Sequence, residues 1–284
     1  MAEVDGNHIL YHYLQKDLQR VDFPFFVQTA LRFAIDLGVW IHPDNYRSLP
    51  IVEPVCVRDP SITTAQRLTW GNPQPHTGLM MDDNSMVKSI VKGSSKLIES
   101  SRISEYDGKS LGNGFVASHV WREVGVQRTL SNRDNRLFTF IPNLVWLPVQ
   151  VSKLSDREGS IVQSVLQQLA AHIYRNQTLN APLQRIIDSC WAEIEAHPHP
   201  FALPLESLPE IEKLSFIRLP SRYIDMKKKK IEKASTALLA HAAGNSIPTG
   251  RILSSKYDHL IPRINRKAAS SLGTWLADYH ASLP

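Results

Sequence analysis

The segment that decides the fold contains three consecutive motifs: GNGFVASHVW at 112–121, FTFIPNLVWLP at 138–148 and VSKLSDR at 151–157. The first two are apolar runs of strand length, rich in β-branched and aromatic residues. They carry a histidine, His119, and an asparagine, Asn143. The third motif is polar and opens a long amphipathic stretch, so the order predicts two strands followed by a helical region.

This order resembles the ββα-metal, or HNH, nuclease core, in which a hairpin and one helix hold a divalent ion against a scissile phosphate. The resemblance implies that His119 is the general base that takes a proton from the attacking water. It also implies that Asn143 braces the loop between the strands and so aims His119. Asn143 opens an Asn-Leu-Val-x-Leu run similar to that of the family, and the resemblance covers about 50 of the 284 residues. The polar segment 127–136 would be the hairpin loop.

The resemblance further implies Mg²⁺ or Mn²⁺ as cofactor, with Ser118, Ser152 and Asp156 at or near its ligand positions. The family commonly has a carboxylate where Ser118 stands and His or Asn where Ser152 stands. Serine is a poor ligand for Mg²⁺, which prefers carboxylate and water oxygens. Two explanations stay open: the site is degenerate, or the ligands come from elsewhere, with Asp134 and Asp107 as alternatives beside Asp156.

Basic residues in two segments are expected to contact nucleic acid. Lys153 and Arg157 match the polar residues that the family often has beyond the second strand. A predicted helix at 222–243 carries a second cluster, consisting of Lys227, Lys228, Lys229 and Lys230. Four consecutive lysines point all round a helix, so the run is either a phosphate-contacting surface or a solvated face.

Length and composition are those of an ordinary soluble protein, with 284 residues, 43% hydrophobic and 21% charged residues, and a net charge of +5. Cys56 and Cys190 stand far apart without a Cys-x-x-Cys, which argues against a disulfide framework or a cysteine zinc site. No apolar run reaches membrane length and the start lacks a secretion pattern, so we expect a cytoplasmic protein. A complete phosphate-binding loop motif is also missing, which leaves nucleoside triphosphate hydrolysis unsupported.

Apolar residues spaced three and four apart predict helices along much of the chain. The predicted helices cover 7–21, 25–39, 86–91, 161–174, 181–196 and 222–243, and a final helix contains Trp275. The acidic cluster at 82–85 is expected to cap the helix that follows rather than to bind metal. Prolines mark 42–78 and 200–221 as connectors, with one short strand near 51–57.

We therefore predict an α+β protein, mostly helical, with an embedded ββα-metal core at 105–176. An N-terminal helical region at 1–104 and a basic helical region at 177–284 would flank the core. The expected function is metal-dependent hydrolysis of double-stranded DNA by a restriction-type endonuclease. Two alternatives stay open, a non-catalytic nucleic-acid-binding protein and a structural or assembly protein. We expect no membrane partner and leave a homodimer open.

Overall fold

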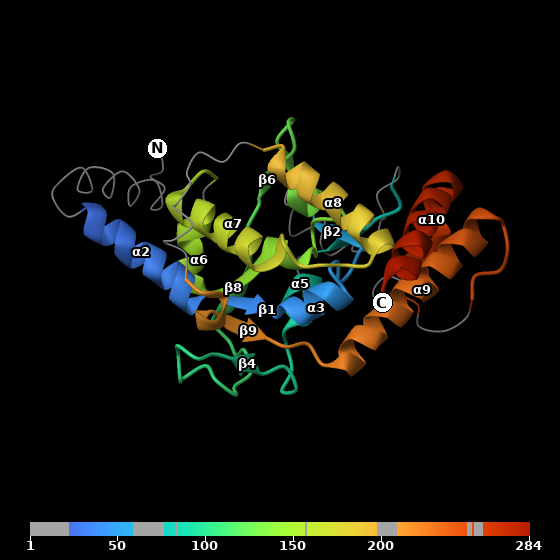
Figure 1. Cartoon of the computed structure of the whole chain (residues 1–284). Coiled ribbons are helices and arrows are strands. Elements are labelled where there is room, and N and C mark those ends of the chain that lie inside the picture. The colour runs from blue at the N-terminus through green and yellow to red at the C-terminus, as the bar shows by residue number, and fades with distance from the viewer. Residues whose placement is uncertain are drawn as a thin grey trace, which may run out of the picture.

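The computed structural model describes residues 23–58, 77–82, 85–156, 158–197, 209–248, 252 and 258–284. It combines helices with a small mixed sheet (Figure 1), which confirms the predicted α+β class. The helix predicted at 7–21 lies outside the described residues. None of the described helices combines the length and the apolar character needed to cross a bilayer.

The central sheet has five strands in the order β4–β9–β1–β8–β5. In its middle, β1 (Val39–Ile41) runs parallel to β9 (Ser215–Ile217) and antiparallel to β8 (Leu144–Pro148). At the two edges, β4 (Ile98–Glu99) is antiparallel to β9, and β5 (Phe115–His119) is antiparallel to β8. The strands come from all three predicted regions of the chain, so the boundaries at 104 and 176 do not divide this sheet.

Neither β1 nor β9 was predicted from the sequence. Residue 39 was assigned to the end of a helix, and 215–217 fell in a proline-rich connector. All six strand residues are buried, which explains why the pattern failed. A strand covered on both faces shows no alternation of polar and apolar residues, and three residues are too few to reveal a period.

Helices α2 (Phe23–Leu37), α6 (Val149–Ser155) and α7 (Ile161–Tyr174) pack on one another beside the sheet, where α2 and α6 contact β8 (Figure 1). The bounds of α7 agree with the prediction. Its first turn is capped by Ser160, whose hydroxyl oxygen accepts a hydrogen bond from the Gln163 amide at 3.2 Å. Its apolar stripe supplies several fully buried side chains to the core.

The remaining short elements surround the sheet. They are α3 (Pro43–Ser48), β2 (Cys56–Arg58), β3 (Met80–Asp82), α5 (Ser85–Ile90), β6 (Glu123–Val124), β7 (Thr129–Leu130), α8 (Ala181–Glu195) and the 3-10 helices η1 (Ser131–Arg133), η2 (Ile141–Asn143), η4 (Ile211–Lys213) and η5 (Asp258–Arg263). Asp82 caps α5 as predicted, because its carboxylate accepts hydrogen bonds from the Ser85 hydroxyl at 2.9 Å and the Met86 amide at 3.0 Å. The strand expected near 51–57 is found as β2, which pairs in parallel with β3.

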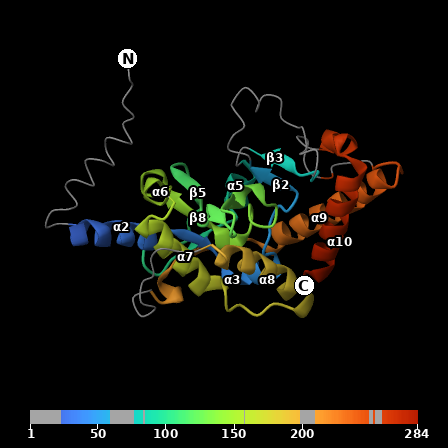
Figure 2. The ribbon, with the colours of Figure 1, turned by 90° about the horizontal axis from the view of Figure 1, so that it is seen from above.

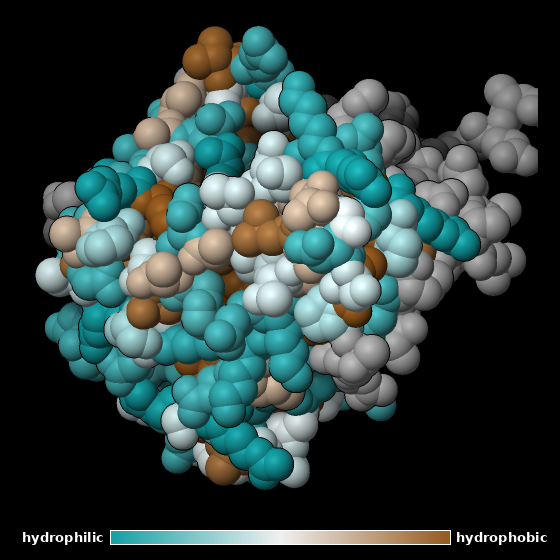
Figure 3. All heavy atoms as spheres, turned by 90° about the vertical axis from the view of Figure 1, so that its right-hand side faces the viewer, coloured by the Kyte–Doolittle hydropathy of each residue, from teal (hydrophilic) through white to brown (hydrophobic). Residues whose placement is uncertain are grey.

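Two long helices, α9 (Ser221–Ala242) and α10 (Arg266–Ser282), pack side by side at one end of the molecule (Figures 1 and 2). Gly273 permits this close approach, since a Cβ there would lie 2.9 Å from the Leu239 side chain. Pro220, rather than the predicted Ser221, occupies the N-cap position of α9. The surface at this end is mostly hydrophilic, with apolar groups scattered over it (Figure 3).

Candidate active site

The hairpin formed by β5 and β8 places His119 at the last residue of β5, directly opposite Leu144. Gly114 precedes the hairpin with φ at +88°, a conformation that L side chains rarely adopt. α6 starts immediately after β8 and packs against both strands. Two strands and a helix therefore occur in the order that the sequence predicts.

His119 is held by the loop that joins the two strands. Its Nε2 lies 3.0 Å from the carbonyl oxygen of Phe138, and its ring stacks on the Phe138 ring with centroids 5.6 Å apart. A carbonyl oxygen only accepts hydrogen bonds, so Nε2 carries the proton in this contact. In the neutral ring Nδ1 then has the lone pair, which is the form that a general base requires.

The surroundings of His119 keep it neutral. Burial lowers the pKa of the imidazole to about 4, although the hydrogen bond to the Phe138 carbonyl raises it. The positive charges of Arg58 and Arg122 lower the pKa further. At neutral pH the ring is therefore unprotonated, and a pKa this low makes it a weaker proton acceptor than an ordinary histidine.

Asn143 is fully buried and ties the loop together. Its Oδ1 accepts a hydrogen bond from the Trp121 amide at 2.7 Å, and its Nδ2 donates to the Leu137 carbonyl at 3.0 Å and the Ser131 hydroxyl at 3.1 Å. The amide thus connects the start of the loop to its end. The Leu137 carbonyl directly precedes Phe138, the residue that holds His119. These bonds agree with the bracing role expected for Asn143.

The residues expected to bind metal are placed differently from the prediction. Ser118 is buried in β5 opposite Val145, and the buried Ser152 donates its hydroxyl to the Val149 carbonyl of its own helix at 2.8 Å. Asp156 follows α6 and lies 3.5 Å from the exposed Lys153 ammonium. The Ser152 hydroxyl therefore bonds within its own helix, the assignment of both serines as ligands stays a prediction, and Arg157 lies outside the described residues.

The two alternative carboxylates have other partners. Asp134 receives two hydrogen bonds from the Arg136 Nε, each 3.1 Å long, and Asp107 accepts a bond from the Ser100 amide at 3.1 Å. Within the described ranges, no three His, Cys, Asp or Glu side chains come together as metal ligands would. The donors present therefore do not fit a bound Mg²⁺, and we derive no step of the reaction through a metal.

The four predicted lysines on α9 divide into different environments. Lys227 is only 4% exposed and forms an ion pair with the buried Glu53, which corrects its assignment as a nucleic-acid contact. Lys228 donates to the carbonyl oxygen of Pro284 at 2.6 Å. Lys229 and Lys230 line a groove on the helix surface. The four lysines differ because successive residues of a helix point in different directions. Lys227 falls on the face of α9 that carries the buried core residues.

Two cations near the histidine were missed. Arg122 follows the first strand by three residues, so its position relative to His119 could have been noticed in the sequence. Arg58 ends β2 in the proline-rich region, and nothing in the sequence connects it with the hairpin. The chain matches no protein-family model, no curated protein and no solved structure.

Proposed function

We propose that this protein hydrolyses phosphodiester bonds in double-stranded DNA, with His119 as the general base. The observation that carries the proposal is the way His119 is held, with one ring nitrogen fixed by the Phe138 carbonyl and the other left with its lone pair. Burial keeps the ring neutral by lowering its pKa to about 4. A neutral, fixed imidazole can take the proton from a water molecule as that water attacks phosphorus.

The positive charges near His119 support a phosphate as the substrate group. Arg58 and Arg122 are close enough to lower the pKa of His119. Guanidinium groups bind phosphate oxygens through paired, charge-assisted hydrogen bonds and stabilise the charge that develops in hydrolysis. Arg122 is exposed and so accessible to a bound strand. The hairpin, its following helix and Asn143 support the ββα part of the proposed core, whereas the donor set described above does not support its metal.

A non-catalytic DNA-binding protein is the second candidate, and a specific observation favours it. The positions at which the nuclease family has metal ligands hold the buried serines Ser118 and Ser152. A protein that has lost its ion would keep the hairpin and the basic surface while losing cleavage. The sequence predicts that cleavage requires Mg²⁺ or Mn²⁺. The experiment that tests for cleavage therefore also varies the metal ion.

The deciding experiment incubates the purified protein with mixed plasmid and phage DNA in the presence of Mg²⁺, Mn²⁺ or a chelator. A restriction-type enzyme should give discrete fragments. His119→Ala should slow cleavage by about 10² or more while retaining the fold and DNA binding. His172→Ala, which removes an exposed histidine on α7, is the matched control and should cut at the normal rate.

Two results would count against the proposal. A folded His119→Ala protein that cuts at the normal rate would remove His119 from the mechanism. DNA binding without cleavage under any metal condition would instead favour the non-catalytic protein. Circular dichroism and thermal melting of each variant establish that a loss of activity is not a loss of fold.

A further inference from the structure

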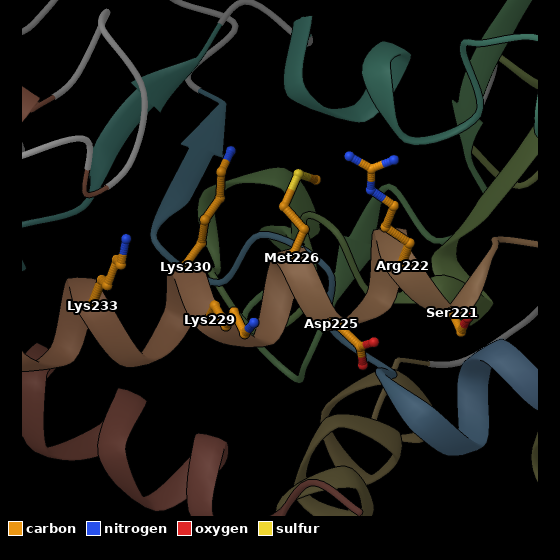
Figure 4. Close-up of a pocket in the computed structure, with 7 residues that line it drawn as sticks. All are labelled: Ser221, Arg222, Asp225, Met226, Lys229, Lys230 and Lys233. Atoms are coloured by element: carbon orange, nitrogen blue, oxygen red, sulfur yellow. The ribbon is translucent and has the colours of Figure 1, made fainter.

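The first half of α9 lines an open, basic groove with a volume of about 690 Å³. Seven residues line it, four of them cationic and one anionic, so the lining carries three net positive charges. They are Ser221, Arg222, Asp225, Met226, Lys229, Lys230 and Lys233. In Figure 4, Arg222, Met226, Lys230 and Lys233 point to one side of the helix, whereas Asp225 points to the other. The acidic group is thus directed away from Arg222, Lys230 and Lys233, whereas Lys229 does not point with these three cations.

Several of these cations are available to a ligand. Arg222, Lys229 and Lys233 are exposed, and among the described residues none forms an ion pair with them. Elsewhere arginines such as Arg136 and Arg218 are bound to carboxylates. A surface that keeps unpaired positive charges together produces a strong local potential that attracts anions.

The length of the row indicates a polyanion rather than a single phosphate group. Arg222 and Lys233 are eleven positions apart, which corresponds to roughly 16 Å along the helix. One DNA strand presents a phosphate about every 3.4 Å along the duplex axis, so several phosphates lie within that length. A small phosphorylated molecule would engage only one end of the row.

A narrower hollow shares Lys230 with the groove and is also lined by Met86 of α5, Cys56 of β2 and the buried Glu53. β2 ends at Arg58, whose charge acts on His119, and α5 packs against β5. Figure 2 shows α5 between β5 and α9. The positive groups in this region are Lys230 on α9 and Arg58 at the end of β2.

We propose that the α9 groove binds the phosphate backbone of duplex DNA and orients it toward His119. In taking DNA as the ligand, this inference rests on the proposed function. The contacts are to phosphates, so they contribute affinity without sequence preference. The groove contains Lys229 and Lys230 of the predicted lysine run, whereas Lys227 is buried and Lys228 donates to the Pro284 carbonyl.

The test measures binding of a labelled duplex by fluorescence anisotropy between about 50 and 200 mM salt. A chelator and the His119→Ala background prevent cleavage. The groove variant is Arg222→Gln/Lys229→Gln/Lys233→Gln. Its slope of log affinity against log salt should shrink by about 0.9 for each lost contact, so by roughly 2.7. The matched control is Arg32→Gln/Lys109→Gln/Lys213→Gln, which removes three exposed charges elsewhere and should leave the slope nearly unchanged.

Equal slopes for the groove variant and the control would overturn the inference, as would failure of the parent to bind duplex at low salt. Tighter binding to anionic lipid vesicles than to DNA would also overturn it. If the triple variant does not fold, the single variants Arg222→Gln and Lys233→Gln should each reduce the slope by about 0.9. If the wild type binds DNA through the groove but does not cleave it, only the nuclease proposal is contradicted. If the wild type cleaves DNA but the groove variant has an unchanged salt slope, only the proposal that the groove binds DNA is contradicted.

Discussion

Two buried polar side chains, Asn143 in the hairpin loop and Lys227 on α9, are satisfied in different ways. Asn143 is uncharged and makes three hydrogen bonds, all to residues of the loop that it closes. Lys227 is paired with Glu53, which lies 174 positions away in the chain. A neutral amide with local partners can be inferred from one motif. A buried charge depends on a partner that only the complete fold provides.

The surroundings of Lys227 show how strongly its buried charge depends on other parts of the fold. Burial, together with the charge of Lys230, lowers the pKa of its ammonium to about 7. The Tyr223 ring also lies beneath the ammonium, with its centroid 5.1 Å from Nζ. Removing one member of such a pair leaves the other charge buried and uncompensated.

The largest effect is expected for Lys227→Met. This change should lower the free energy of unfolding by about 3–5 kcal/mol, because Glu53 is left buried without its cation. Lys229→Met, two positions along the same helix but exposed, should change it by only about 0.5 kcal/mol or less. Urea unfolding measures both. The double variant Glu53→Leu/Lys227→Met should recover most of the loss, and equal losses for Lys227→Met and Lys229→Met would contradict the buried pair.

Asn143→Ala is expected to have the next largest effect. It leaves the Trp121 amide and the Leu137 carbonyl without their partners, which should cost roughly 2–4 kcal/mol of stability. Cleavage should fall as well, since the loop that holds His119 loosens. Thermal melting and cleavage rate are measured together, with the exposed Asn113→Ala as control. An activity loss of about tenfold with an unchanged melting curve would mean that Asn143 acts directly on the substrate.

The sequence allowed local features to be predicted and left long-range ones hidden. The pairing of β5 with β8 and the bounds of α7 follow from motifs contained within one short segment, in which Asn143 also makes its hydrogen bonds. The central strands β1 and β9 were missed because three buried residues carry no period. The position of Arg58 near His119 was missed because it depends on how separate segments meet.

The lysine run at 227–230 was predicted in part. Its helix was predicted, yet four identical residues gave no direct indication of which one is buried. The spacing did contain that information, because Ile224, Lys227 and Ile231 are three and four positions apart and share one face. The sequence also did not show that the Ser152 hydroxyl bonds to the backbone of its own helix, as a serine in a helix can do.

A smaller effect is expected from the titration of His119 in the hairpin, which makes stability depend on pH. The unfolded chain takes up a proton on His119 near the ordinary pKa of 6.5, whereas the folded chain does so only near 4. The unfolded state therefore binds more protons between these values, and stability falls as pH decreases through that window. From about pH 7 to pH 5 the loss should be up to about 2 kcal/mol. The loss should be smaller in His119→Gln and unchanged in His172→Gln, as measured by urea unfolding at each pH, and His42, whose pKa burial also lowers, contributes a loss of the same sign in both variants.

The cleavage rate, unlike stability, should depend little on pH in this range. At about pH 5.5 a histidine of ordinary pKa is roughly nine-tenths protonated, whereas His119 remains neutral. The cleavage rate should therefore change by only about twofold between pH 7.5 and 5.5. A fall of about tenfold with a midpoint near 6.5 would show that the base is not the shielded histidine described here.

The smallest effect is expected for Ser152→Ala, which separates a structural serine from a metal ligand. Among the described residues, the Ser152 hydroxyl bonds to the Val149 carbonyl in its own helix, and alanine favours helix more than serine does, so the two contributions nearly cancel. We expect a change in stability of about 0.5 kcal/mol or less and an unchanged cleavage rate. Ser155→Ala is the matched control, because Ser155 is also buried and makes the same bond to the Ser152 carbonyl. If Ser152→Ala alone abolishes metal-dependent cleavage while both proteins melt like the wild type, Ser152 is a ligand and its structural assignment is wrong.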